Sequence, residues 1–161
     1  MKRLHRDDLY CWSDFDEARN IDFNSVLWVR DGGNVVVDPM PLGWHDLQHL
    51  AELGGAAWIV VTNSDHTRAA RALAAHTGAK IAGPAAERGT LDLDCDRWLE
   101  DGDTLVEGFV AMALEGSKTP GELALVIDGS TLITGDLVRA HRAGALMMLP
   151  EAKLTDPDAA R

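Results

Sequence analysis

The sequence has few cysteines, no long apolar run and no block of Lys and Arg large enough to bind a polyanion, and each deficit excludes a class of protein. Its two cysteines, Cys11 and Cys95, lie far apart and form no C-x-x-C pair, which excludes a disulfide framework and a zinc knuckle. No apolar run approaches the roughly 18 residues of a membrane helix, and the charged residues 1–8 lack the apolar core of a signal peptide. We therefore expect a soluble, cytoplasmic protein with reduced thiols.

Basic residues are also too few for a partner that is a polyanion. Against 26 Asp and Glu there are 15 Lys and Arg, a net charge of −11. Nucleic acid and anionic membranes would be repelled by this charge, so neither is expected as a partner. The 161 residues, 46% of them hydrophobic, are enough for one domain, residues 1–161, with a core of its own.

Apolar runs and turn residues predict an α/β chain. A β-hairpin is expected first, then a helix, and then a strand, a helix and a strand that pack as one unit. These expected elements are strands 27–30 and 34–38, a helix at 43–53, a strand at 57–61, a helix at 66–77 and a strand at 79–82. Mostly antiparallel strands follow, around 104–106, 110–114, 123–127 and 131–134.

Polar clusters follow several of these strands, at Asn63 to His66, at Lys118-Thr119-Pro120-Gly121 and at Gly135-Asp136. With the hairpin, Val-Asp-Pro and the buried strand before them, they make residues 22 to 140 resemble the metallo-β-lactamase superfamily. The resemblance implies an αββα sandwich, a zinc centre and hydrolytic activity. It also implies a further helix, strand and helix after Asp136, so the chain looks truncated, with its last strand and helix missing.

Most zinc ligands of that family are replaced in this sequence. The family's loop His-x-His-x-Asp-His maps onto residues 61–66, its next histidine onto Lys118 and its bridging carboxylate onto Asp136. Valine cannot bind a metal and asparagine is a poor zinc ligand, so Val61 and Asn63 supply no part of a hydrolytic site. A dinuclear zinc centre is therefore not expected.

The residues that remain allow two kinds of site. Asp65, His66 and Asp136 could hold a single divalent metal, with the imidazole favouring zinc, iron or manganese. Alternatively, the ammonium group of Lys118 could neutralise both carboxylates in a salt-bridged pocket without metal, because metal and protonated lysine would compete for the same space.

Two functions therefore stay open. One is a hydrolase of an ester or thioester with at most one metal ion, in which Asp65 and Lys118 are the catalytic candidates. The other is a non-catalytic relative that binds a small-molecule ligand or is structural, and the chain could also form a homo-oligomer. In either case Asn63, Thr119 and Arg139 are the candidate ligand-pocket residues.

Each candidate also has a plain structural interpretation. Asp65 could simply cap the following helix, and His66 in its first turn could be a satisfied or an exposed histidine. Asp136 could be a turn residue, and Arg139 could belong to a solvated basic loop at 139–142.

Overall fold

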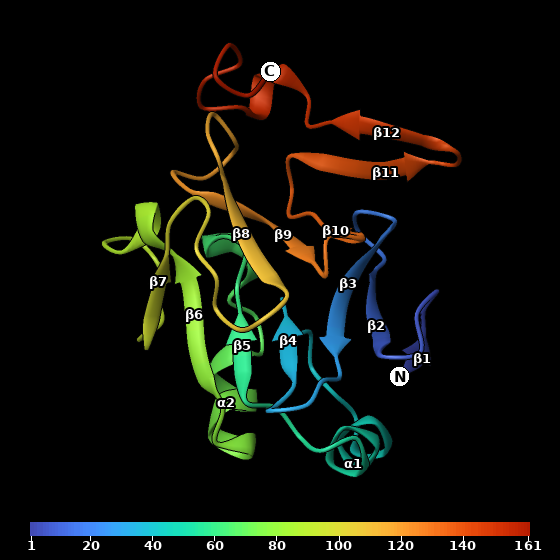
Figure 1. Cartoon of the computed structure of the whole chain (residues 1–161). Coiled ribbons are helices and arrows are strands. Elements are labelled where there is room, and N and C mark those ends of the chain that lie inside the picture. The colour runs from blue at the N-terminus through green and yellow to red at the C-terminus, as the bar shows by residue number, and fades with distance from the viewer. The chain divides into compact units, whose positions relative to one another are not determined.

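The apolar runs near the centre of the chain form the parallel part of a mixed sheet (Figure 1). The computed structural model describes residues 1–161 apart from the side chain of His141. Strands β4 (Val35–Val37), β5 (Trp58–Val60) and β6 (Lys80–Pro84) pair in parallel, in that order. All three residues of β4 are buried, as expected for a strand covered on both faces.

Antiparallel strands extend this sheet toward the N-terminus. Strand β3 (Ile21–Trp28) pairs with β4, which confirms the predicted hairpin, and β2 (Leu9–Asp16) and β1 (Lys2–Arg3) follow in order. Neither β1 nor β2 was predicted. In the hairpin turn Gly33 has φ +112°, and a Cβ there would lie 2.5 Å from the side chain of Ala57, so only glycine fits.

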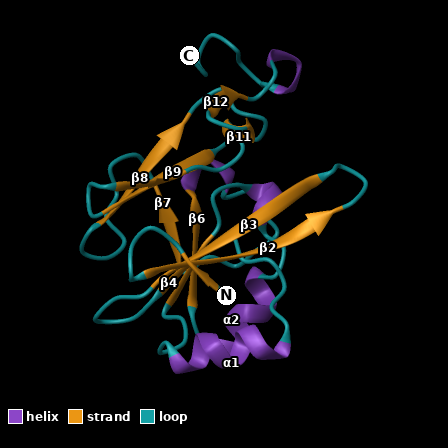
Figure 2. Ribbon diagram, turned by 90° about the vertical axis from the view of Figure 1, so that its right-hand side faces the viewer, coloured by secondary structure: helices purple, strands orange, loops and turns teal.

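The helices are purple in Figure 2. Helix α1 (Trp44–Glu52) confirms the helix predicted for 43–53. Helix α2 (Ala70–Thr77) confirms the end of the second predicted helix, because Gly78 terminates it with φ +75°.

The predicted beginning of α2 at residue 66 is wrong. Residues 64–66 form a 3₁₀ turn (Ser64–His66), and Arg68 then adopts φ +29°, outside the helical region. The amide of Ala69 donates to the carbonyl of Pro39 at 3.0 Å. Because of this contact with a segment distant in the sequence, the helix begins only at Ala70.

The described chain forms two compact units. The first unit, with strands β1 to β5, most of β6 and both α-helices, consists of Met1–Val61, His66–Ala82 and Leu93–Asp96. The second unit consists of Thr62–Asp65, Gly83–Asp92 and Arg97–Arg161.

Antiparallel strands dominate the second unit. Its sheet has the order β10-β9-β8, and β11 pairs with β12 in a separate hairpin. The strands of this unit are β7 (Arg97–Leu99), β8 (Phe109–Leu114), β9 (Glu122–Ile127), β10 (Thr131–Ile133), β11 (Val138–Arg142) and β12 (Ala145–Met148). Two 3₁₀ turns complete it, η2 (Ala85–Glu87) and η3 (Glu151–Lys153).

Two sequence predictions fail in this unit. The strand expected around 104–106 is absent from the described structure, because the carbonyl of Val106 accepts a turn hydrogen bond from the amide of Phe109. The loop expected at 139–142 is part of β11, with Arg139 opposite Met147. Strands β8, β9 and β10 confirm the other three predictions.

The apolar side chains of β8 and β9 anchor the loops that follow and precede them. Phe109, Leu123, Leu125 and Ile127 are fully or almost fully buried, and each such side chain contributes roughly 1.5–3 kcal/mol to folding. Buried side chains therefore hold the two strands that flank the loop between β8 and β9. Across the described residues, none of the helices has the length and apolar character needed to cross a bilayer.

Candidate functional site

Three predicted site residues meet in the second unit, which contains Asp65, Lys118 and Asp136. Lys118 lies in the loop between β8 and β9, Asp136 lies between β10 and β11, and Asp65 lies in the 3₁₀ turn at 64–66. The first two loops start from neighbouring strands of one sheet. The sheet therefore brings together residues that are far apart in the sequence.

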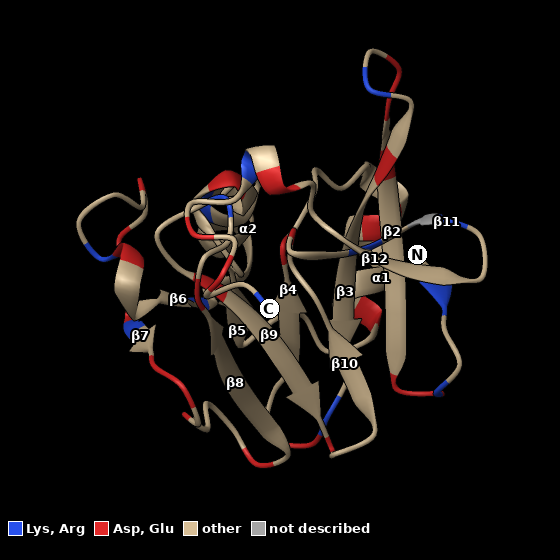
Figure 3. Ribbon diagram, turned by 90° about the horizontal axis from the view of Figure 1, so that it is seen from above, with Lys and Arg blue, Asp and Glu red and all other residues tan. Residues whose placement is uncertain are grey.

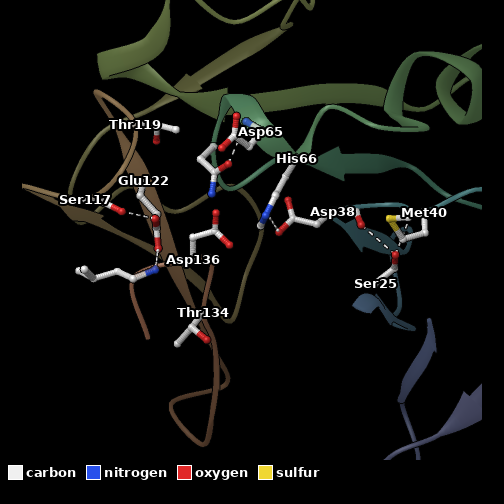
Figure 4. A network of polar contacts seen from close by, with 12 residues as sticks. Ser25, Asp38, Met40, Asp65, His66, Ser117, Thr119, Glu122, Thr134 and Asp136 are labelled. Atoms are coloured by element: carbon white, nitrogen blue, oxygen red, sulfur yellow. Dashed lines mark hydrogen bonds and ion pairs between the residues drawn. The ribbon is translucent and has the colours of Figure 1, made fainter. Parts of the chain in front are cut away.

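Lys118 lies between the two carboxylates. Its Nζ donates to Asp136 Oδ2 at 2.9 Å and forms a second ion pair with Asp65 Oδ2. Figure 4 shows the side chains of Asp65 and Asp136 approaching a common centre. The Asp136 side chain is 18% exposed, compared with 35% for Lys118 and 48% for Asp65, so Asp136 is the more sheltered partner.

The lysine in this cluster is held in its charged form. Partial burial disfavours the ammonium, but the hydrogen bonds with Asp65 and Asp136 outweigh burial and raise the pKa of Lys118. A protonated lysine has three donors and no lone pair. Lys118 therefore acts here as a fixed cation and has no free amine for nucleophilic attack.

Arg139 adds a second cation to the cluster. Its Nε donates to the backbone oxygen of Asp136 at 2.9 Å, and its guanidinium lies 3.7 Å from Asp136 Oδ1. The solvated-loop interpretation of Arg139 is wrong, since the side chain is only 20% exposed and strand β11 carries it. Of the basic residues at 139–142, only the side chain of His141 lies outside the described structure.

Asn63 and Thr119 are buried and face the protein backbone. Asn63 Oδ1 accepts from the amide of Asp65 at 3.0 Å, and the Thr119 hydroxyl donates to the carbonyl of Gly121 at 2.9 Å. Within the described part of the chain, Asn63 Nδ2 has no hydrogen-bond partner. Asp65 does not cap α2, whose N-cap residue is Ala69, so the helix-cap interpretation of Asp65 is also wrong.

His66 belongs to the first unit and has a carboxylate partner there. Its Nδ1 lies 2.9 Å from Asp38 Oδ2, and both side chains are buried. The carbonyl of Asp38 accepts from the hydroxyl of Ser25, which in turn accepts from the amide of Met40 (Figure 4). This network fixes the ring of His66, so His66 is a buried histidine with a carboxylate partner, as its interpretation as a satisfied histidine predicts.

A dinuclear zinc centre does not fit the residues at the corresponding positions. Val61 has no donor atom, Asn63 Oδ1 already accepts a backbone hydrogen bond, and the Lys118 ammonium has no lone pair. The same ammonium occupies an oxygen of Asp65 and an oxygen of Asp136. Among the residues whose side chains are described, no three His, Cys, Asp or Glu converge to hold a metal ion.

Two buried carboxylates near the cluster were not found by sequence reasoning. Glu122 is 1% exposed and Glu87 is fully buried, and both contact residues of the loop between β8 and β9. A sequence signal exists for Glu122, because a charged residue there directly precedes the apolar run of β9. Glu87 lies in a polar segment and gives no such signal.

Comparison with known proteins gives one family. A sequence model described as "Metallo-beta-lactamase superfamily" matches residues 1–161. No curated protein matches the chain.

Solved structures of that fold are similar to this chain. DIM-1 metallo-beta-lactamase has a TM-score of 0.69 and 14% identity, over 89% of this chain and 72% of that chain. ETHE1 from Myxococcus xanthus has a TM-score of 0.62 and 22% identity, over 81% of this chain and 59% of that chain. TTHA1623, solved in a di-iron-bound form, has a TM-score of 0.63 and 23% identity, over 85% of this chain and 76% of that chain. At these identities the likeness shows the fold alone.

Proposed function

Because the chain belongs to the metallo-β-lactamase superfamily and has its α/β fold, we propose that it is a non-catalytic member that binds a small-molecule ligand without a metal. The observation that carries this proposal is the position of Lys118 between Asp65 and Asp136. In this proposal the ammonium supplies the positive charge that a metal supplies elsewhere. The family's hydrolytic activity would then be absent.

The exposed part of the cluster defines the ligand class that we propose. Lys118 has three donor hydrogens and uses two on carboxylates, which leaves one for an acceptor on a ligand. Asp65, whose side chain is 48% exposed, would accept from a donor on the same ligand. A small polar molecule with a hydroxyl or amine beside a carboxylate meets both requirements.

Metal analysis tests the proposal directly. We expect protein purified without chelator to contain less than about 0.1 zinc, iron or manganese ion per chain after dialysis, and we expect added metal to leave its melting temperature unchanged. Lys118→Met should bind zinc better than Lys118→Arg, which keeps the charge. One ion per wild-type chain that is lost in Asp136→Ala would refute the proposal.

The second candidate function is a hydrolase of an ester or thioester with a single metal ion. One observation favours it: a buried carboxylate on Nδ1 of His66 is the arrangement that fixes the tautomer of metal-binding histidines. Assays with ester and thioester substrates, with and without added zinc, iron or manganese, separate the two functions. Hydrolysis that depends on metal and disappears in His66→Ala would establish this second candidate.

The distribution of charge supports a small ligand as the partner. Acidic residues, red on the ribbon in Figure 3, are spread over many loops, and basic residues, blue, are interspersed among them. A net charge of −11 opposes binding to nucleic acid or an anionic membrane. A homo-oligomer and a cytoplasmic location stay predictions from the sequence, and sedimentation velocity tests the first.

A further inference from the structure

We propose that Glu122 is the positioning residue that holds Lys118 and Asp136 at bonding distance, by joining the two loops that carry them. This inference rests on the proposed function, since it assigns the support of the same ion cluster. Glu122 opens β9 and is 1% exposed. Its role would be structural support of the cluster, without contact with a ligand.

Both oxygens of the Glu122 carboxylate accept hydrogen bonds from neighbours of the ion pair. Oε2 accepts from the hydroxyl of Ser117 at 2.5 Å, and Oε1 accepts from the amide of Leu137 at 2.7 Å. Ser117 directly precedes Lys118, and Leu137 directly follows Asp136. One buried side chain therefore binds the hydroxyl of the residue before Lys118 and the backbone amide of the residue after Asp136, and Figure 4 shows Glu122 between Ser117 and Asp136.

The glycine before Asp136 supports the same assignment by close packing. A Cβ at Gly135 would lie 2.9 Å from Glu122 Oε1 and 3.0 Å from its Cδ, too close for any other residue without a shift. Residues 135 and 137 therefore both lie against Glu122. The backbone on either side of Asp136 depends on that carboxylate for its position.

The chemistry of the carboxylate explains why glutamate suits this position. Ser117 is fully buried, and a buried hydroxyl and a buried amide both need an acceptor. An ionised carboxylate accepts from both at once without donating. Glutamine would keep one acceptor oxygen for Leu137 but would present an NH₂ group to the hydroxyl of Ser117, and alanine would leave both donors unsatisfied.

Exchange of the lysine ammonium protons tests this role. The chain has four lysines, Lys2, Lys80, Lys118 and Lys153, so a ¹⁵N-lysine spectrum is simple, and Lys118→Arg assigns the signal. In the wild type the Lys118 ammonium should exchange more slowly than those of the other lysines, since two carboxylates hold it. In Glu122→Ala its exchange should accelerate by roughly fivefold, the factor that one hydrogen bond supplies, and in Glu122→Gln by less.

A matched control separates positioning from general loosening of the fold. Leu125→Ala removes a fully buried side chain from the same strand and should lower stability without changing the exchange of Lys118. If Leu125→Ala and Glu122→Ala accelerate exchange equally, the inference is wrong.

The remaining outcomes distinguish the inference from the proposed function. If Lys118 is protected in the wild type and unchanged in both Glu122 variants, the inference fails while the proposed function survives. If Lys118 is unprotected in the wild type, the ion cluster and the proposed function fail as well. Should Glu122→Ala not fold, Glu122→Gln supplies the comparison.

Discussion

Replacement of Lys118 by methionine removes the charge at the centre of the cluster and keeps most of the side-chain volume. The bond to the sheltered Asp136 is a charge-assisted hydrogen bond that contributes about 1.5 kcal/mol, whereas the pair with the half-exposed Asp65 contributes about 0.5 kcal/mol. The two carboxylates would then face each other without the ammonium between them, and their repulsion, which Arg139 beside Asp136 reduces, costs a further amount of about 0.5 kcal/mol, the value of an exposed charge pair. We expect Lys118→Met to lower the free energy of unfolding by about 2–3 kcal/mol.

Urea denaturation of a double-mutant cycle measures this contribution. Lys118→Met, Asp136→Asn and the double variant should show a coupling free energy of about 1 kcal/mol or more, because each single change removes the same bond. Lys118→Arg, which keeps a positive charge, is the control and should lose less. Additive effects of the two single variants, or a loss of less than about 0.5 kcal/mol in Lys118→Met, would refute the reasoning.

The pH dependence of the same variant has a definite sign. The pKa of Lys118 is raised in the folded protein above its ordinary value of 10.5, so its contribution is fully present below 10.5 and is lost as the pH rises through the folded pKa. The difference in stability between wild type and Lys118→Met should therefore stay constant from about pH 6 to about pH 9. It should shrink only in strongly alkaline solution.

Three further changes test other parts of the structure. Gly135→Ala should lower the free energy of unfolding by about 1–3 kcal/mol in urea denaturation, because its Cβ would collide with a buried carboxylate, whereas Gly89→Ala, with nothing within 4 Å, should be nearly neutral. Burial, together with the flanking aspartates, raises the pKa of the Cys95 thiol to about 11. Alkylation of Cys95 by iodoacetamide at about pH 8, followed by mass spectrometry, should therefore be roughly a hundredfold slower than alkylation of an ordinary cysteine. Hydrogen bonds from Arg6 lower the pKa of Asp8 below its ordinary value of 3.8. Asp8→Asn should therefore lower the free energy of unfolding by about 1 kcal/mol at neutral pH. This difference should disappear as the pH falls through the folded pKa of Asp8.

Local sequence signals predict the elements whose structure depends on neighbours in the sequence. The two-glycine turn before β4, helix α1 and the buried strands β5 and β9 follow from turn residues and apolar runs. Strand β2 was missed because its pairing with β3 gives it order, and only two of its eight residues are buried. The early part of α2 was predicted wrongly for the same reason, since a bond from Ala69 to Pro39 decides its first residue.

The candidate site likewise has features that local sequence signals predict and features that only the folded structure shows. The resemblance to the family predicts that Lys118 stands at the position of a metal-binding histidine and that Asp65 and Asp136 remain as acidic residues, and each of these predictions depends on a short local motif. The two hydrogen bonds of Glu122 are not visible there, because they join residues 117 and 137 through a strand that starts between them. Which element supports a charge pair is a property of the packed sheet, which no single sequence position records.

A lysine and a metal ion stabilise such a cluster to very different extents, and this difference explains why the loops need other support. A structural zinc site contributes roughly 10–16 kcal/mol to folding, whereas the two lysine ion pairs contribute about 2 kcal/mol. A cluster centred on Lys118 therefore stabilises its loops far less than a structural zinc site would. Glu122 and the bond from the hydroxyl of Thr155 to the carbonyl of Ser117, at 2.6 Å, supply anchors that do not depend on a cation. We expect removal of these anchors to disturb the cluster, measured by the exchange of the Lys118 ammonium, more than removal of Lys118 disturbs the loops.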